Sequence, residues 1–326
     1  MLHYPSIPDI QFQLLNLKSR IIQTPIHLWN TPLKNRLLGK DTFPVFKLEL
    51  LQVTGTFKIR GVFTAIDQMS DEQKSNGIVV GTGGNHGIAV AYAAKAADIH
   101  AKVLVPRTIN AMRRKMIEDL GATIVELDSI NMILEEMEEL AQRENRTIIH
   151  PFNDPAMIIG SGTLGYELLQ QAPNLDAVIV PIGGGGLAAG LSCAIKQLNP
   201  NCKIYGVEPI GAASMAASFK TGKAERIEGG PKSIADSLCS PKTEEYSLSI
   251  CKDFVDKIVT VTDDQIRSAM RILFEDVKLA VEPAGATAMS ALLGPLKAEL
   301  YEKKIGVIVC GSNINCESFH EILNSK

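Results

Sequence analysis

Four consecutive glycines, Gly183 to Gly186, constrain the fold of this chain more than any other feature. They follow the apolar run 177–180, which predicts a buried strand, and they precede 187–191, which predicts the start of a helix. Glycines at such a turn let backbone N–H groups converge at the positive end of a helix without obstruction by Cβ atoms. The sequence therefore predicts a strand–turn–helix unit that binds a phosphate group.

Apolar runs and helical patterns alternate along most of the chain. Runs rich in β-branched residues are typical of strands buried on both faces of a parallel sheet. One series covers 78–80, 101–105, 123–127 and 147–149, with helical patterns at 88–97, 111–120 and 132–143, and a second covers 177–180, 203–207, 257–261 and 305–309. The pattern predicts an α/β protein with two open, mostly parallel sheets covered by helices. We expect a large domain formed by 1–76 plus 152–326 and a small domain formed by 77–151.

The composition excludes several classes of function. With 326 residues, 45% of them hydrophobic and 21% charged, the chain can bury a large core and is not disordered. The formal net charge of −3 and the lack of a basic tract argue against nucleic acid as a partner. No apolar stretch reaches the roughly 20 residues that span a membrane. The six cysteines form no CxxC motif and the N-terminus lacks signal-peptide features, so we expect reduced thiols and a cytoplasmic location.

The glycine run also fits a dinucleotide-binding fingerprint. Residues 184–189 read G-x-G-x-x-A, and Glu208 ends the next expected strand about 20 residues further on. Taken alone, this unit predicts an NAD-dependent dehydrogenase, and a tight turn without any ligand is a further interpretation. Three other segments bear on the choice.

The first of these segments is 54–61, where Lys58 lies between Phe57 and Ile59 and is bracketed by Gly55 and Gly61. A partly buried lysine has a lowered pKa, so its amine is available as a nucleophile toward an aldehyde. An ordinary solvated lysine beside a helix start is the alternative, because most lysines are exposed.

The other two segments end predicted strands. Residues 81–87 read G-T-G-G-N-H-G, and His86 stands where a dinucleotide fingerprint needs a small residue. N–H groups with Asn85 and His86 at a helix start suit a carboxylate, although capping and turn geometry also favour these residue types. Residues 307–313 end a strand in Cys310, at the edge where α/β proteins bind ligands, although a lone cysteine is usually a structural thiol.

Together these segments resemble the fold-type II enzymes that depend on pyridoxal 5′-phosphate, which include tryptophan synthase β-like proteins. The resemblance is to the threonine/serine dehydratase and serine racemase branch. It extends from 24–26 to the C-terminal strand and includes Gly-Val-Glu-Pro at 206–209, Pro-Lys-Ser-Ile-Ala-Asp at 231–236 and Val-Glu-Pro-Ala-Gly at 281–285. It implies pyridoxal 5′-phosphate as the cofactor, an amino acid as the substrate and a homodimer as the assembly.

The resemblance also implies a role for each motif residue. Lys58 matches the lysine that forms the internal aldimine and then acts as the base at Cα, and Phe57 matches the residue beside the cofactor ring. Asn85 matches the donor to the phenolic oxygen, and Cys310 matches the residue facing the pyridine nitrogen. The phosphate seat matches Gly183, Gly184, Gly185, Gly186 and Leu187, and the loop for the substrate carboxylate matches Thr82, Gly83, Gly84, Asn85 and His86.

Cys310 has a chemical consequence for the reaction. A free thiol has a pKa of about 8.5, so it cannot keep the ring nitrogen protonated as an aspartate would. The cofactor is then a weaker electron sink, which disfavours a long-lived carbanion and transamination. Loss of a β-hydroxyl group remains feasible, and the enzymes of this branch release a 2-oxo acid and ammonia.

Several positions depart from the family pattern. Racemases carry a serine on the ring face opposite the lysine, and Gly83 stands there, so racemisation is not expected as the main activity. The family's cation site uses a Glu, a backbone carbonyl and an Asp. Glu208 and Ala212 match, but Ser214 replaces the Asp, so we expect no metal and at most a remnant of that site. Ser237 replaces a usual glycine near the pocket and leaves the substrate preference open.

The sequence thus predicts an ammonia-lyase that converts L-threonine and/or L-serine to 2-oxobutanoate or pyruvate and ammonia by β-elimination. The alternatives within the fold are dehydration of 3-hydroxyaspartate or phenylserine and, less favoured, racemisation of serine. An NAD-dependent dehydrogenase is the alternative from another class, and it would leave Lys58 without a role.

Overall fold

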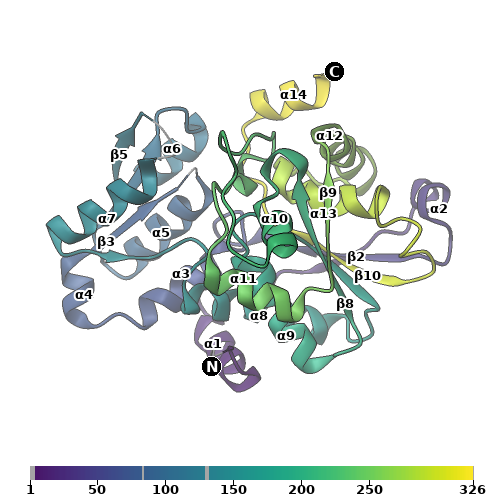
Figure 1. Ribbon diagram of the computed structural model, residues 1–326, viewed down its shortest axis with the longest axis horizontal. Coiled ribbons are helices and arrows are strands. Elements are labelled where there is room, and N and C mark those ends of the chain that lie inside the picture. The colour runs from purple at the N-terminus through teal and green to yellow at the C-terminus, as the bar shows by residue number, and fades with distance from the viewer. Residues whose placement is uncertain (1–3, 83, 129–131, 326) are drawn as a thin grey trace.

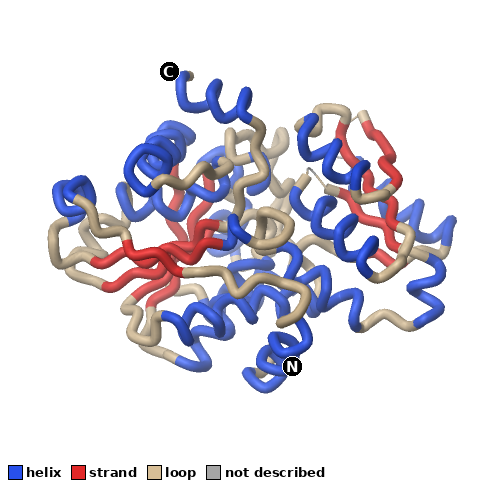
Figure 2. The backbone as a smooth tube through the Cα atoms, turned by 180° about the vertical axis from the view of Figure 1, so that it is seen from behind, coloured by secondary structure: helices blue, strands red, loops and turns tan. Residues whose placement is uncertain are grey.

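The strands of this chain form two separate groups, each surrounded by helices (Figure 1 and Figure 2). The computed structural model describes residues 4–82, 84–128 and 132–325, so Gly83, one of the predicted site residues, lies outside the described residues. Both sheets are open and mostly parallel, which confirms the predicted fold class.

The larger sheet has six strands in the order β1-β2-β10-β7-β8-β9. Strand β1 runs antiparallel to β2, and the remaining neighbours pair in parallel. Every residue of β7 is buried, as expected for a central strand covered on both faces. The strands are β1 (Ile26–Leu28), β2 (Phe43–Leu48), β7 (Ala177–Pro181), β8 (Lys203–Pro209), β9 (Lys257–Val261) and β10 (Lys304–Val309).

The sequence pattern did not indicate β1 and β2. Strand β1 has three residues and lies at an edge, so two of its side chains are exposed. Strand β2 contains Lys47, a charged residue that interrupts the apolar run, yet this side chain is buried because it pairs with Glu167. A buried ion pair formed across a long stretch of chain leaves no local hydrophobic signal.

The smaller sheet has four parallel strands in the order β5-β4-β3-β6. All of them lie between residues 78 and 148, and the division of the chain into domains at 76 and 152 stays a prediction. The strands are β3 (Ile78–Gly81), β4 (Ala101–Pro106), β5 (Thr123–Leu127) and β6 (Thr147–Ile148), and the helices between them are α5 (Asn85–Ala96), α6 (Ala111–Asp119) and α7 (Ile133–Glu144).

Helices cover both faces of the larger sheet (Figure 1). Helix α13 packs against β7, β8, β9 and β10, while α8 and α9 pack together on the other side. Helix α3 contacts both α8 and α5, so it lies between the two sheets. The remaining helices and turns are α1 (Ile7–Leu17), α2 (Pro32–Leu38), η1 (Glu49–Leu51), α3 (Lys58–Asp67), α4 (Asp71–Asn76), α8 (Pro155–Gln171), α9 (Gly186–Leu198), η3 (Ile210–Ala212), α10 (Ser214–Thr221), η4 (Asp236–Leu238), α11 (Glu245–Phe254), α12 (Asp263–Ile272), η5 (Leu273–Val277), α13 (Pro283–Leu293) and α14 (Cys316–Asn324).

The thiols and the helix lengths agree with the composition. All six cysteines are free, and Cys193, Cys202, Cys251 and Cys310 are buried. Within the part of the chain that the structure describes, the helices are too short or too polar to cross a bilayer.

Candidate functional site

The residues predicted to hold the cofactor meet in one cavity beside the carboxyl ends of β7 and β10. A second cavity adjoins it, since Lys58, Asn85, Phe152, Gly184 and Ser237 line both. The first cavity is lined by Phe57, Lys58, Asn85, Gly183, Gly184, Gly185, Gly186, Leu187 and Cys310 among others. The second is lined by Thr82, Gly84, Asn85 and His86 among others. The structure therefore brings together all the described residues that the sequence singled out for cofactor and substrate.

Lys58 is the first residue of α3, and its side chain is partly buried. Its Nζ donates to the carbonyl of Pro151 at 2.7 Å and lies 5.2 Å from the centre of the Phe57 ring. Burial lowers the pKa of Lys58 to about 8, and nearby Cys310 opposes the shift. An amine with this pKa is partly deprotonated near neutral pH, so it can attack an aldehyde.

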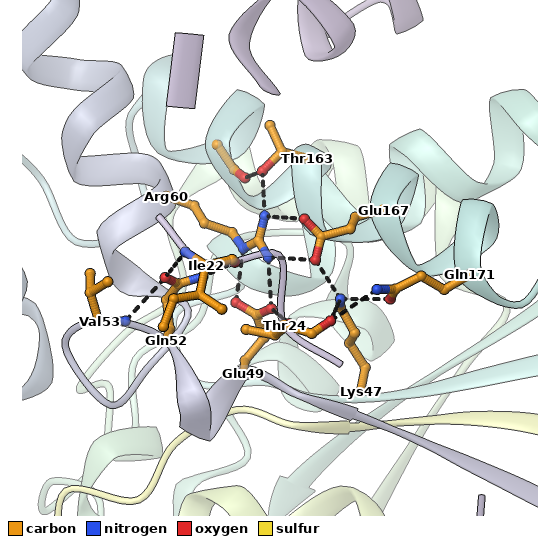
Figure 3. Close-up of polar contacts among 11 residues, drawn as sticks. Ile22, Thr24, Lys47, Glu49, Gln52, Val53, Arg60, Thr163, Glu167 and Gln171 are labelled. Carbon is orange, nitrogen blue, oxygen red and sulfur yellow. Dashed lines mark hydrogen bonds and ion pairs between the residues drawn. The ribbon is translucent and has the colours of Figure 1, made fainter. Parts of the chain in front are cut away.

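A buried cluster of charges anchors the helix that begins at Lys58 (Figure 3). The Arg60 guanidinium donates to the carboxylates of Glu49 and Glu167 at 2.8–3.1 Å, and Lys47 Nζ also donates to Glu167. These four side chains, the Arg60 cluster, are at most 2% exposed. Sequence reasoning missed them, because nothing in the local pattern pairs residues that far apart in the chain.

The glycine run forms the turn between β7 and α9, as predicted. Gly185 has φ of 97°, a conformation that residues with a Cβ rarely adopt. A Cβ on Gly184 would lie 2.3 Å from the ring of Phe152, so this position has room for glycine only while that ring stays in place. The first turn of α9 leaves its N–H groups without partners inside the helix, and they are available to an anion.

The Gly-Asn-His turn leads into α5 in the same way. Helix α5 begins at Asn85, and the N–H of Gly84 donates to Thr82 Oγ1 at 3.0 Å. The Nε2 of His86 lies 2.8 Å from the carbonyl oxygen of Ile149, and burial lowers the pKa of His86 to about 3. His86 is therefore neutral, so within the described part of this turn the ring adds no positive charge, and the backbone N–H groups at the helix start are available to a carboxylate.

The Asn85 side chain lies in a network that sequence reasoning did not find. Its Nδ2 donates to Glu282 Oε1 at 2.7 Å, and Arg113 donates to the other oxygen of Glu282 at 3.0 Å. Burial raises the pKa of Glu282 to about 7, although Arg113 opposes the shift. The sequence offered one signal for Glu282, because it is a single acidic residue in an apolar segment, between Val281 and Pro283. It offered no signal for Arg113.

Cys310 follows β10 directly and is buried. Burial raises the pKa of its thiol far above the ordinary value, so it stays protonated. The hydroxyl of Thr56 lines the same cavity and is buried without a hydrogen-bond partner among the described residues. Both groups can meet a polar atom of a bound molecule.

The residues that match the family's cation site in sequence do not fit a divalent ion. The two carboxylate oxygens of Glu208 accept from the N–H groups of Met215 and Ala216, at 2.9 and 2.7 Å, in the first turn of α10. Burial raises the pKa of Glu208 to about 8. Divalent cations in proteins take several oxygen ligands, usually with more than one carboxylate, but Ser214 supplies a neutral hydroxyl that accepts from Thr243. Among the described residues, no three His, Cys, Asp or Glu side chains are grouped to hold a metal.

Comparison with known families gives a match over most of the chain. Residues 19–311 match the family model described as pyridoxal-phosphate dependent enzyme. This match overturns the NAD-dependent dehydrogenase alternative. Glu208, the residue expected to bind the ribose of NAD, does not fit that role either. It is fully buried, and its carboxyl group accepts from N–H groups at the start of α10.

Similar proteins include enzymes with different reactions. The chain is 47% identical to the phenylserine dehydratase of Ralstonia pickettii, over 84% of each chain. It is 36% identical to the L-threonine ammonia-lyase of Thermotoga maritima, over 85% of this chain and 69% of that protein. Its fold matches the structure of maize serine racemase with a TM-score of 0.91 at 33% identity, covering 98% of this chain and 97% of that one.

The cavity residues fit pyridoxal phosphate. An amine suits its aldehyde, a glycine turn at the start of α9 suits its phosphate, and an unpartnered buried hydroxyl at Thr56 can meet one of its polar atoms. A side chain at Gly184 would collide with Phe152 and fill the seat. The groups that line the cavity therefore match both the aldehyde end and the phosphate end of pyridoxal phosphate.

Proposed function

Since the chain belongs to the family of pyridoxal-phosphate dependent enzymes, we propose that it is an ammonia-lyase that converts a β-hydroxy-α-amino acid to a 2-oxo acid and ammonia. Water leaves in the β-elimination and is taken up again when the resulting imine hydrolyses, so ammonia is the only net loss. The observation that supports this proposal most directly is that Lys58, the glycine turn and Cys310 line one cavity. A second cavity, which has room for the rest of the substrate, opens from it. The ammonia-lyase and dehydratase among the similar proteins support the same reaction.

Lys58 is the proposed anchor and base. Pyridoxal phosphate, when bound, withdraws electrons from the substrate's Cα and so makes its proton removable. The depressed pKa of Lys58 suits both attack on the cofactor's aldehyde and removal of that proton. The first turn of α5 would hold the substrate carboxylate through backbone N–H groups, which orients Cα toward the lysine.

The elimination reaction is favoured over two competing reactions. The protonated thiol of Cys310 cannot hold a proton on the ring nitrogen, which disfavours transamination. Racemisation needs a second acid on the face opposite Lys58, and Gly83 has no side chain to supply it. We therefore propose a lyase rather than a racemase, although a serine racemase shares this fold.

The proposed substrates are L-threonine and/or L-serine, and phenylserine is a second candidate. The second cavity has a volume of about 140 Å³, several times the roughly 30 Å³ share of one water molecule in the liquid. Apolar side chains of Ile133, Leu134 and Phe152 form part of its wall, which suits a substituent larger than a methyl group. The 47% identical phenylserine dehydratase favours the same candidate.

3-Hydroxyaspartate is a weaker candidate. Its second carboxylate would enter a cavity lined by the carboxylate of Asp236 and by neutral His86. Apart from Lys58, the described residues along this cavity offer no cationic side chain to balance the extra charge. Burying an unpaired carboxylate there would cost binding energy.

The test is a substrate panel on the purified holoenzyme. L-Threonine, L-serine, threo-3-phenylserine and threo-3-hydroxyaspartate are compared by kcat/KM for 2-oxo acid and ammonia release. We expect turnover of at least one of the first three and loss of turnover in Lys58→Ala. Borohydride reduction followed by mass spectrometry should locate the cofactor on Lys58. A cofactor attached elsewhere, or no 2-oxo acid from any member of the panel, contradicts the proposal.

We further propose a homodimer in the cytoplasm. Exposed apolar side chains such as Phe12 and Leu15 on α1 are candidates for burial in a dimer, and free thiols suit a reducing compartment. Light scattering coupled to size-exclusion chromatography measures the mass of the assembly. A monomeric mass at micromolar concentration contradicts the dimer.

A further inference from the structure

Five side chains form a closed ring of hydrogen bonds between the two cavities. Asn85 Nδ2 donates to Glu282 Oε1 at 2.7 Å and to Ser237 Oγ at 3.1 Å. Ser237 Oγ donates to Asp236 Oδ1 at 3.2 Å. Arg113 closes the ring, because it donates to Asp236 Oδ2 at 2.6 Å and to Glu282 Oε2 at 3.0 Å. We call these residues the Asn85 ring.

The ring joins elements of the two sheets. Asn85 and Arg113 belong to α5 and α6, which pack on the smaller sheet. Asp236 and Ser237 belong to η4, and Glu282 immediately precedes α13 on the larger sheet. Every bond of the ring except the one between neighbours Asp236 and Ser237 therefore spans the two parts of the molecule.

The amide of Asn85 has no hydrogen to spare. Its two N–H groups serve Glu282 and Ser237, and its Oδ1 accepts from Asn313 Nδ2 at 2.9 Å. These three partners also fix which way the amide points, with Nδ2 toward the two acceptors. Donation by Asn85 to a cofactor oxygen, as the resemblance implies, requires one acceptor to give way.

Ser237 is the acceptor that gives way at the lower cost. Glu282 is 1% exposed, so the loss of a hydrogen bond would leave a buried carboxylate oxygen poorly satisfied. Ser237 is exposed, so water can replace the amide as its partner. The Ser237 hydroxyl donates its single hydrogen to Asp236 Oδ1 and accepts from Asn85. It therefore has no second hydrogen to donate to a cofactor oxygen.

We propose that Ser237 competes with the cofactor for one N–H of Asn85 and is thereby a positioning residue for the phenolic oxygen of the cofactor. The inference rests on Asn85 as the donor to that oxygen. Ser237 stands where the resemblance leads us to expect a glycine, so this competition distinguishes the chain from relatives that carry no side chain there. A hydrogen bond to the phenolic oxygen favours its ionised form, so sharing the N–H keeps that oxygen protonated to a higher pH.

The test compares three substitutions at this exposed position. Cofactor-free protein is titrated with pyridoxal phosphate, and the absorption spectrum of the holoenzyme is followed against pH. Ser237→Gly and Ser237→Ala should bind the cofactor about two- to tenfold more tightly, as expected for removal of one neutral hydrogen bond. The pH midpoint of the spectrum should fall. Ser237→Thr keeps the hydroxyl and should behave as the wild type.

A merely structural role for Ser237 predicts the opposite sign. Loss of packing or of the ring would weaken cofactor binding and leave the spectral midpoint unchanged, and that result overturns the proposal. A wild-type affinity in both Ser237→Gly and Ser237→Ala overturns it as well.

A double-mutant cycle with Asn85→Ala separates the inference from its premise. When Asn85 is absent, Ser237→Ala should no longer change affinity or midpoint. If Asn85→Ala alone changes neither quantity, the assignment of Asn85 fails, and the inference fails with it. If Asn85→Ala changes both but the Ser237 variants change neither, Asn85 keeps its role and the competition is wrong. None of these outcomes depends on whether the enzyme releases a 2-oxo acid.

Discussion

Two buried groups of charged side chains, the Arg60 cluster and the Asn85 ring, balance their charges differently. In the Arg60 cluster two cations, Arg60 and Lys47, face two carboxylates, Glu49 and Glu167 (Figure 3). Burial alone would raise the pKa of Glu49, but its contacts with Arg60, Lys47 and Thr24 together outweigh burial and lower the pKa below its usual value. Glu49 therefore keeps its charge near neutral pH.

In the Asn85 ring one cation faces two carboxylates. Arg113 shares its guanidinium between buried Glu282 and more exposed Asp236, and the pKa of Glu282 rises to about 7 because burial dominates. Glu282 can therefore gain or lose a proton near neutral pH. The difference separates a cluster that holds the fold from one that lines the site and can respond to what binds there.

Arg60→Met should give the largest loss of stability. It removes the partner of two carboxylates and leaves them buried with Lys47 alone, so we expect unfolding to become easier by about 3–5 kcal/mol. Urea denaturation of wild type and variant measures this difference.

Arg20→Met is the matched control, because its ion pair with Asp67 is about 30% exposed on each side. Its loss should stay below about 1 kcal/mol. Equal losses in the two variants would show that burial of the Arg60 cluster does not determine its contribution.

Arg113→Met should cost less stability than Arg60→Met, although both guanidinium groups are buried. Glu282 can neutralise its charge by taking up a proton, so we expect a loss of about 1–3 kcal/mol. The variant should also lower kcat/KM at least tenfold, because the Asn85 ring borders both cavities. A stability loss equal to that of Arg60→Met contradicts the proposed difference between the two groups.

The two groups should also respond to pH with opposite signs. Glu282 has a folded-state pKa of about 7, above its ordinary 4.5. Between pH 4.5 and pH 7 the native protein therefore keeps a proton on Glu282 that the unfolded chain has released. Its contribution to stability is present below about pH 4.5 and is lost as pH rises through 7, by at most about 1.4 kcal/mol per pH unit. Glu49 has a lowered pKa, so its contribution is present above pH 4.5 and is lost as pH falls.

Glu282→Gln isolates the first of these contributions. The fall in unfolding free energy between pH 5 and pH 7 should become shallower in this variant than in the wild type, as measured by urea denaturation at each pH. An unchanged slope would mean that Glu282 does not titrate in this window. Glu→Gln keeps the shape of the side chain, so a change in slope would report the proton rather than packing.

Sequence reasoning found the parts of the site that have local signatures. Gly185 has a positive φ, and Lys58 and Cys310 have apolar neighbours, so each gave a local signal. Their roles at one site were predicted from the resemblance to a family. Arg113 and Phe152 reach the site from elements distant in the chain. Their side chains look like an ordinary helix surface or loop until the sheets are assembled, and no local period records such contacts.

Another buried carboxyl group, Glu208, sharpens the comparison with the smallest expected effect. Its two oxygens accept from the N–H groups of Met215 and Ala216, and burial raises its pKa to about 8, so it carries little charge near neutral pH. Calcium should therefore leave the melting temperature of the wild type unchanged within about 1 °C. Ser214→Asp adds a second carboxylate beside it and should create a need for a cation, so calcium should raise the variant's melting temperature by about 2–4 °C and a chelator should reverse the rise. Stabilisation of the wild type by calcium would instead mean that a cation displaces the helix N–H groups from Glu208. Its charge balance would then be closer to that of the Arg60 cluster, where partners of full charge face each carboxylate.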